Sequence, residues 1–177
     1  MIGIGGVGMS AVAKLLVSYN KNVTGSDMGS TDILLDLKKR GIKIYPKHAD
    51  SNIEEVTDLV IYSSAIPHDN EELVKAKQLG IKTLTYFEFI GELSLKYSTI
   101  VVTGTHGKST TTAMLGMILE EAGYDPTVIV GTLVPGFKDG NLRVGRGRFL
   151  VIEGCEYKAN MMSIEPEMVV LTNIEMD

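Results

Sequence analysis

A short loop past the middle of the chain carries the residue types that bind a nucleoside triphosphate. Successive backbone N–H groups in such a loop can face a phosphate, Lys108 can reach the β and γ phosphates, and the Ser109 hydroxyl can ligate Mg²⁺. The common pattern GxxxxGK[ST] would need a glycine where this chain has Val102, so the turn is tighter. We therefore expect an ATP site here, and we call residues 104–110 the phosphate loop. It connects a β-branched run at 99–103 to a predicted helix at 108–122 and reads Gly104-Thr105-His106-Gly107-Lys108-Ser109-Thr110.

One carboxylate is placed to complete a metal site beside this loop. Glu153 ends the apolar run 149–153, which predicts a strand. A carboxylate at the end of a strand parallel to the one before a phosphate loop can reach Mg²⁺. We therefore expect Ser109 and Glu153 as metal ligands. His106, inside the loop, could orient a phosphate or a carboxylate substrate.

For other polar residues near these segments, the sequence does not predict a catalytic or metal-binding role. Asn173, Glu175 and Asp177 follow the next predicted strand and fall on the same edge of the sheet. Cys155 and Glu156 are expected to be an ordinary thiol and an ordinary loop charge. His48 and His68 are predicted to be solvent-exposed loop residues, and no Cys/His set has zinc spacing.

A second glycine-rich loop opens the chain, and we call residues 3–8 the nucleotide loop. Gly3, Gly5 and Gly8 fit GxGxxG between a predicted strand and a predicted helix. Glycines there permit a tight turn and the close approach of a diphosphate to backbone N–H groups at the helix N-terminus. The pattern alone is weak, because a helix-capping turn without a ligand can also produce it. We expect Gly5, Gly6, Val7 and Gly8 to bind substrate.

A carboxylate strengthens the interpretation of the nucleotide loop. Asp27 lies about 20 residues beyond Gly8 and just after the second predicted strand, where it can accept hydrogen bonds from ribose hydroxyls. The ordinary alternative is a loop cap. The combination predicts a bound nucleotide but does not say which nucleotide.

A third loop follows the fourth predicted strand on the same edge. Ser63, Ser64 and Ala65 lie in the segment SSAIP. Ligands of open α/β sheets bind at the carboxyl ends of the strands, so these residues are further candidates for substrate binding. A serine pair is more often a simple turn, which makes this the weakest of the three loops.

Hydrophobic periodicity predicts strands that alternate with helices, and therefore a mostly parallel α/β sheet covered on both faces. The pattern restarts near residue 98, which predicts a Rossmann-like domain at 1–97 followed by a truncated P-loop ATPase domain at 98–177. Strands are expected at 1–5, 22–25, 42–45, 58–62, 82–85, 99–103, 127–130, 149–153 and 168–171, with a hairpin-like stretch at 139–148. Helices are expected to start in the nucleotide loop and at 33–40, 71–79, 87–95 and 108–122. The first strand is expected to lack a few residues, and the second domain to be incomplete.

Composition narrows the class of partner. The chain has 17 Lys+Arg against 22 Asp+Glu, a net charge of −5, so nothing in its charge favours nucleic acid or an anionic membrane surface. Hydrophobic residues make up 44%, enough for a folded core. One cysteine and no signal-peptide or membrane-span pattern lead us to expect a cytoplasmic protein.

The chain resembles the Mur ligases of bacterial peptidoglycan synthesis in six segments, and most closely those members that add L-alanine. The segments are GIGGVGMS, GSD at 25–27, YSSAIP, VTGTHGKSTTTAM, EGCEYK and LTNIEMD. The resemblance covers the family's N-terminal UDP-binding domain and the first part of its central ATPase domain. Where the family often has EADE, this chain has Glu153-Gly154-Cys155-Glu156, which keeps the metal-binding Glu.

The resemblance implies an ATP-dependent ligase that joins the carboxylate of UDP-N-acetylmuramic acid to L-alanine through an acyl phosphate. The nucleotide loop would then hold the UDP-sugar rather than NAD, and ATP and Mg²⁺ would be required. Lys108, Glu153 and His106 would be the catalytic residues. The two loops would open on the same side of two successive sheets, so that the sugar carboxylate could meet the terminal phosphoryl group.

Three alternatives remain open from the sequence. A related ligase attaches a recycled peptide to the same sugar nucleotide and shares much of the pattern. A nucleotide-binding sensor module, in which a dinucleotide occupies the first domain, is a second possibility. The third is that these 177 residues alone are an inactive fragment.

Overall fold

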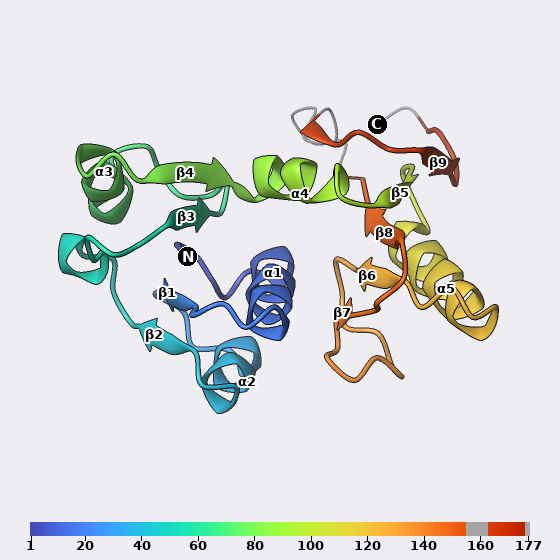
Figure 1. Cartoon of the computed structure of the whole chain (residues 1–177), viewed down its shortest axis with the longest axis horizontal. Coiled ribbons are helices and arrows are strands. Elements are labelled where there is room, and N and C mark those ends of the chain that lie inside the picture. The colour runs from blue at the N-terminus through green and yellow to red at the C-terminus, as the bar shows by residue number, and fades with distance from the viewer. Residues whose placement is uncertain (155–162, 176–177) are drawn as a thin grey trace. The chain divides into compact units, whose positions relative to one another are not determined.

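The computed structural model describes residues 1–154 and 163–175, which form two compact units, Met1–Phe89 and Ile90–Asp177 (Figure 1). The units divide inside one helix, α4 (Tyr86–Ser94). The sequence placed the domain boundary after residue 97, just beyond the end of that helix. Each unit is described by itself below.

The first unit is built on short parallel strands. β1 (Thr24–Ser26) pairs with β2 (Lys43–Tyr45), and β3 (Leu59–Tyr62) pairs with β4 (Lys82–Thr85). Ile2 joins the two pairs, because it forms single parallel bridges with Ser26 on one side and Tyr62 on the other. The residues that follow β1 and β3 therefore lie at the same edge as the nucleotide loop. The strand predicted at 1–5 is reduced to these bridges at Ile2.

Helices follow the strands in the order that the sequence predicted. α1 (Val7–Ser18) and α2 (Asp32–Lys39) pack around a cluster that includes Ile4, Ala13 and Leu37. α3 (Glu71–Gln78) packs with Leu73 and Ala76 against a second cluster containing Ile2 and Val60. A short 3₁₀ helix, η1 (Asp50–Asn52), was not predicted.

The second unit is a five-stranded sheet with the order β7-β6-β8-β5-β9. All neighbours are parallel except β7, which pairs antiparallel with β6. The hairpin-like stretch of the sequence supplies β7. α5 (Lys108–Glu121) follows β5 and contributes Ala113 to the core. The strands are β5 (Ser98–Thr103), β6 (Thr127–Ile129), β7 (Leu142–Arg143), β8 (Phe149–Glu153) and β9 (Met168–Leu171).

The α/β fold class is confirmed, with both units built mainly on parallel strands. The strand order explains the hydrophobic runs. The central strands β5 and β8 are almost wholly buried; β8 reads FLVIE, and β5 carries three consecutive apolar residues, Ile100 to Val102. β9 lies at the edge of its sheet, where Val169 and Leu171 are about half exposed.

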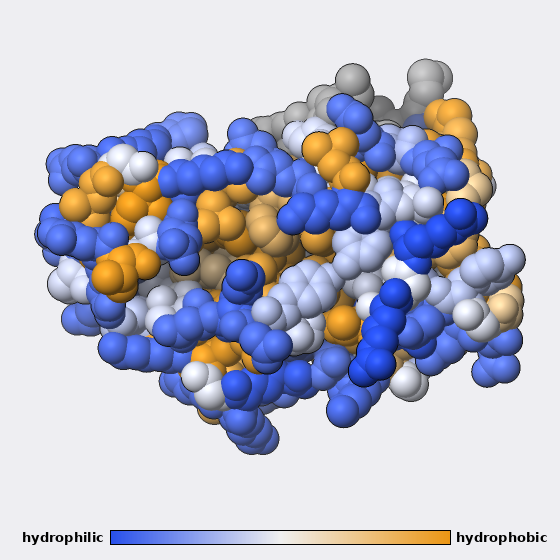
Figure 2. Space-filling model, viewed as in Figure 1, coloured by the Kyte–Doolittle hydropathy of each residue, from blue (hydrophilic) through white to orange (hydrophobic). Residues whose placement is uncertain are grey.

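The face of the protein in Figure 2 is mainly hydrophilic, with separate hydrophobic patches. None of the helices among the described residues is long and apolar enough to cross a membrane.

Candidate functional site

The nucleotide loop leads directly into α1, whose first turn has no side-chain cap. Gly3 has φ +74°, a left-handed conformation that favours glycine, and Gly6 N–H donates to Gly3 O at 3.3 Å to close the turn. Gly6 is the N-cap residue, with an extended backbone and no side chain to cap the helix. Because the first N–H groups of a helix have no partners within the helix, the start of α1 is a place where an anion can bind.

Asp27 holds the nucleotide loop in place. Its Oδ2 accepts a hydrogen bond from Gly5 N at 2.8 Å, and its Oδ1 accepts one from Gly29 N at 2.8 Å. A Cβ on Gly5 would lie 2.8 Å from Asp27 Oδ2, so glycine is required for this approach. The Gly5 amide is thus engaged with Asp27, while the carboxylate keeps further lone pairs for a ligand hydroxyl.

The other predicted substrate residues lie around the same loop. Ser63 N–H donates to Ile2 O at 3.0 Å, and a Cβ on Gly3 would lie 3.1 Å from Ser63 Cβ. Ser63 Oγ accepts from Ala65 N at 3.3 Å, which shapes the turn, while Ser64 and Ala65 are exposed.

Tyr86, at the start of α4, was missed by the sequence analysis, although its ring packs against Gly8. A Cβ on Gly8 would lie 2.8 Å from the ring carbon that bears the hydroxyl. The sequence spacing gives no signal for this contact. Gly8 is therefore needed for close packing against Tyr86.

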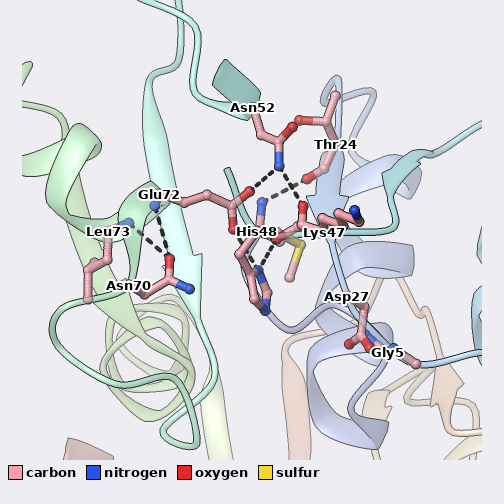
Figure 3. Close-up of polar contacts among 12 residues, drawn as sticks. Gly5, Thr24, Asp27, Lys47, His48, Asn52, Asn70, Glu72 and Leu73 are labelled. Carbon is pink, nitrogen blue, oxygen red and sulfur yellow. Dashed lines mark hydrogen bonds and ion pairs between the residues drawn. The ribbon is translucent and has the colours of Figure 1, made fainter. Parts of the chain in front are cut away.

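A buried polar cluster includes Ser26, the residue before Asp27, and the sequence did not predict it (Figure 3). Glu72, 1% exposed, accepts hydrogen bonds from Ser26, His48 and Asn52. We call these four residues the Glu72 cluster. The prediction that His48 is solvent-exposed was wrong: its side chain is 15% exposed and its Nδ1 lies 2.8 Å from Glu72 Oε2. A histidine in a polar loop gave no sign of a buried acid 24 residues away.

In the second unit, the phosphate loop is shaped by glycines and by its own lysine. Gly104 has φ +132° and Gly107 has φ +79°, and Gly107 is the N-cap of α5 with no side-chain cap. Lys108 Nζ donates to Gly104 O at 2.5 Å and to Thr105 O at 3.2 Å. Ser109 and Thr110 are the next two residues of α5, with Ser109 partly buried and Thr110 exposed. The first amides of α5 and the Lys108 ammonium are thus gathered around one loop.

Residues after β9 clamp this loop. Asn173 Oδ1 accepts from His106 N at 2.9 Å, and Asn173 Nδ2 donates to His106 O at 3.1 Å. Thr172 Oγ1 donates to the same carbonyl at 2.6 Å, and a Cβ on Gly104 would collide with that hydroxyl. The His106 side chain itself is 71% exposed, with Nε2 3.6 Å from Glu175 Oε2. The sequence put Asn173 and Glu175 on this edge but gave neither a role.

Glu153 lies beside the phosphate loop through strand register. Val102 of β5 is paired with Glu153 of β8, and Glu153 Oε1 accepts from Gly131 N at 2.8 Å. Carboxylate and hydroxyl oxygens are ligands that Mg²⁺ prefers, and Mg²⁺ usually takes only one or two of them from the protein. Glu153 and Ser109 therefore carry the kind of oxygen atoms that Mg²⁺ prefers.

No group of three or more His, Cys, Asp or Glu side chains that could hold a metal occurs within residues 1–154 and 163–175. Cys155, Glu156 and Asp177 lie outside the described residues.

The first unit contains a cavity of about 420 Å³ that does not involve the residues predicted to bind substrate. It is lined by residues at the start of β1 and β3, among them Val23, Thr24, Leu59 and Val60. None of the predicted substrate residues lines it.

Comparisons with known proteins identify a family. Residues 1–98 match the model of the Mur ligase family, catalytic domain. The chain is 43% identical over 177 residues to the UDP-N-acetylmuramate–L-alanine ligase of Acetivibrio thermocellus, covering 99% of this chain and 37% of that protein. It is also 43% identical to the enzyme of the same name from Caldicellulosiruptor saccharolyticus, covering 100% of this chain and 39% of that protein. The chain thus spans about two fifths of these relatives' length.

Solved structures agree with this assignment. The crystal structure of UDP-N-acetylmuramate-alanine ligase MurC from Thermotoga maritima superimposes with a TM-score of 0.91 at 34% identity, covering 99% of this chain and 41% of that one. The UDP-N-acetylmuramate:L-alanyl-gamma-D-glutamyl-meso-diaminopimelate ligase from Neisseria meningitides superimposes with a TM-score of 0.89 at 26% identity, covering 99% of this chain and 60% of that one.

Proposed function

This chain belongs to the Mur ligase family, and from that premise we propose that it is part of an ATP-dependent ligase that joins UDP-N-acetylmuramic acid to L-alanine. The observation that carries the proposal is the 43% identity, along the whole chain, to relatives named for that reaction. Peptidoglycan precursors would be its products, and ATP would place the reaction in the cytoplasm.

The first unit would bind the sugar nucleotide. The diphosphate would lie against the start of α1, which has no side-chain cap, near Gly8. Asp27 would accept hydrogen bonds from ribose hydroxyls with the lone pairs that Gly5 and Gly29 leave. Gly6 and the turn at Ser63–Ala65 would border the same ligand.

The second unit would bind ATP. The amides at the start of α5 would face the phosphates, and Lys108 would exchange the carbonyls of Gly104 and Thr105 for phosphate oxygens. Ser109 and Glu153 would hold Mg²⁺, which supplies positive charge to the phosphates. His106 would remain in place through Asn173, with its exposed ring free to approach a phosphate or the substrate carboxylate.

The proposed chemistry has two steps. A carboxylate oxygen of the muramyl group attacks the γ-phosphorus, the bond to the β–γ bridging oxygen breaks, and an acyl phosphate and ADP form. The amine of L-alanine then attacks the acyl carbon, loses a proton, and expels inorganic phosphate to leave an amide. Catalysis would be mainly positional and electrostatic, with Lys108 stabilising the charge on the transferred phosphoryl group.

A titration distinguishes this function from a dinucleotide sensor. UDP-N-acetylmuramic acid, NAD and ATP are titrated separately into the protein in a calorimeter. Binding of the UDP-sugar and ATP, without NAD, is the expected result. NAD binding with no response to the UDP-sugar would replace the ligase with the sensor.

The structural similarity to the Neisseria meningitides protein favours one further candidate, a ligase that adds a peptide to the same sugar nucleotide. The amine substrate separates the two. In a polypeptide of the relatives' full length that carries this chain, phosphate release should depend on L-alanine; dependence on the tripeptide instead would establish the second candidate.

A further inference from the structure

Gly131 contacts Glu153, the acid of the proposed Mg²⁺ site in the second unit. Gly131 N–H donates to Glu153 Oε1 at 2.8 Å, and no other hydrogen bond to this carboxylate occurs among residues 1–154 and 163–175. A Cβ on Gly131 would lie 2.9 Å from Oε2 of the same carboxylate. The amide therefore holds one oxygen, and the absence of a side chain leaves space for the other.

Strand register places Glu153 between two loops. In the sheet, β8 lies between β5 and β6, so Glu153 at the end of β8 has a neighbouring strand on each side (Figure 1). Val102 of β5 pairs with Glu153, two residues before the phosphate loop begins. On the other side, Ile129 of β6 pairs with Ile152, and Gly131 follows Ile129 by two residues. The carboxylate thus lies at the edge where the phosphate loop and the loop after β6 both begin.

The loop after β6, residues 131–140, is fixed at both sides of the Gly131 amide. Val130, the residue before Gly131, is fully buried. Val134 N–H donates to Gly140 O at 2.9 Å, which closes the loop, and the Val134 side chain packs in the core of the sheet. Because Gly131 lies between these two buried valines, close packing limits how far its amide can move.

The donor chemistry of this contact suits a divalent cation. A carboxylate that accepts a hydrogen bond on one oxygen is held in one orientation, which is the common arrangement for ligands of metal ions. Oε2 of Glu153 keeps its lone pairs for such an ion. A methyl group at position 131 would occupy the space beside Oε2 and displace the carboxylate. The fold would tolerate that methyl group, because Gly131 has no left-handed φ and the carboxylate is the end of a flexible side chain.

We propose that Gly131 is a positioning residue, which holds the Glu153 carboxylate through its amide and keeps Oε2 accessible to the Mg²⁺ that accompanies ATP. The inference rests on the proposed function, because it needs Glu153 to be a metal ligand. Any side chain with a Cβ at position 131 would then weaken metal binding without removing a ligand.

A double-mutant cycle tests the inference, with Mn²⁺ as the probe. Electron paramagnetic resonance measures how tightly the complex of the protein with a non-hydrolysable ATP analogue binds Mn²⁺, for the wild type, Gly131→Ala, Glu153→Gln and the double variant. We expect Gly131→Ala to weaken Mn²⁺ binding about tenfold, the usual effect of removing a group that orients a metal ligand. The double variant should be no weaker than Glu153→Gln, since Gly131 acts through Glu153.

Thr132→Ala is the matched control, because Thr132 is the next residue of the same loop and is exposed. It should leave the Mn²⁺ affinity unchanged. If Gly131→Ala has the affinity of the wild type, or if its loss adds to that of Glu153→Gln, the inference fails while Glu153 remains a metal ligand. If Glu153→Gln itself binds Mn²⁺ as tightly as the wild type, the proposed function has the wrong metal ligand, and the inference fails with it.

Turnover separates positioning from a general structural role. In a polypeptide of the relatives' full length that carries this chain, Gly131→Ala should raise the Mg²⁺ concentration at half-maximal rate about tenfold, with the KM for L-alanine unchanged. A lower rate that no Mg²⁺ concentration restores, together with a lower melting temperature, would show damage to the fold and contradict the inference.

A measurement on the wild type covers the case in which Gly131→Ala does not fold. The amide resonance of Gly131 in ¹⁵N NMR reports on its hydrogen bond to Glu153. We expect this resonance to shift when Mg²⁺ is added to the wild-type complex with the ATP analogue, and to stay in place in Glu153→Gln. An unchanged resonance in the wild type would contradict the inference.

Discussion

The two glycine-rich loops are held in opposite ways. In the nucleotide loop a carboxylate is the anchor, because Asp27 accepts the Gly5 N–H. In the phosphate loop an amide is the anchor, because Asn173 both accepts from and donates to the backbone of His106. The first loop therefore carries an acid, which suits ligand hydroxyls, and the second carries a cation, Lys108, which suits a triphosphate.

A glycine-rich turn at the start of a helix is therefore a feature that both loops share, and it does not by itself distinguish one ligand from another. Both α1 and α5 begin at a glycine without a side-chain cap. In the proposed function, the ligand would be selected by residues that other strands bring to the turn. These are Asp27 after β1 in one unit, and Thr172, Asn173 and Glu153 in the other.

The largest effect is expected from removing the cation of the second loop. Lys108→Ala should lower ATP turnover at least ~10²-fold in a polypeptide of full length, because a preorganised positive group at the transferred phosphoryl is lost. UDP affinity should stay within twofold or so, because the nucleotide loop is unchanged. Turnover assays and UDP calorimetry measure the two quantities.

Lys138→Ala is the control for that experiment, since Lys138 is an exposed lysine of the second unit outside the phosphate loop. It should leave turnover unchanged. Loss of both UDP binding and ATP turnover in Lys108→Ala would show that the two loops have been assigned to the wrong ligands.

Removing the acid of the first loop tests the other side of the comparison. Asp27→Asn keeps an oxygen for Gly5 N–H but loses the charge that strengthens hydrogen bonds from ribose hydroxyls, so UDP affinity should fall by about 10–100-fold. Calorimetry with UDP and with an ATP analogue gives the answer. An equal loss of ATP affinity would break the separation between the loops.

The clamp on the second loop should have a smaller effect. Asn173→Ala removes both side-chain hydrogen bonds to His106 and should weaken ATP binding about tenfold, since the loop must be ordered on binding. UDP binding should not change. An ATP affinity equal to that of the wild type would show that Thr172 and Lys108 hold the loop without Asn173.

The smallest effect is expected on the free energy of unfolding at low pH, because the two units contain different ion pairs. In the first unit, burial alone would raise the pKa of Asp36, but hydrogen bonds and charge from Arg40 and Lys14 outweigh it and lower that pKa. In the second unit, the hydrogen bond from Arg143 lowers the pKa of Glu120 at an exposed site. A carboxyl whose folded pKa is lowered stabilises the fold above its unfolded pKa of about 4, and this stability is lost as the pH falls through the folded value.

Asp36→Asn should therefore lower the free energy of unfolding at pH 7 by at most about 1 kcal/mol, because Asp36 is partly exposed and solvent screens its charge. Glu120→Gln should cost less, because both side chains of its ion pair with Arg143 are more exposed (49% and 16%) than Asp36 and Lys14 (40% and 5%). Urea unfolding at pH 7 and at pH 3 measures both. If Asp36→Asn has the same loss at both pH values, the ion pair is not its cause.

The sequence was sufficient to predict those features that depend on local residue patterns. The β-branched and apolar runs that end in polar loops predicted β5, β8 and β9. The glycine-rich turns predicted where α1 and α5 begin. Contacts between distant residues could not be predicted. His106 and Asn173 are 67 residues apart, and Ser26 and Glu72 are 46 apart. Only the assembled sheet brings these pairs together, and neither residue of a pair has a local signature that points to the other.

The central claim is that one chain carries two independent nucleotide sites. The direct test is calorimetric titration of a non-hydrolysable ATP analogue into protein saturated with UDP-N-acetylmuramic acid. We expect one analogue to bind per chain, and we expect Lys108→Ala to abolish this binding while Asp27→Asn leaves it intact. Displacement of the UDP-sugar by the analogue would mean a single shared site and would contradict the account.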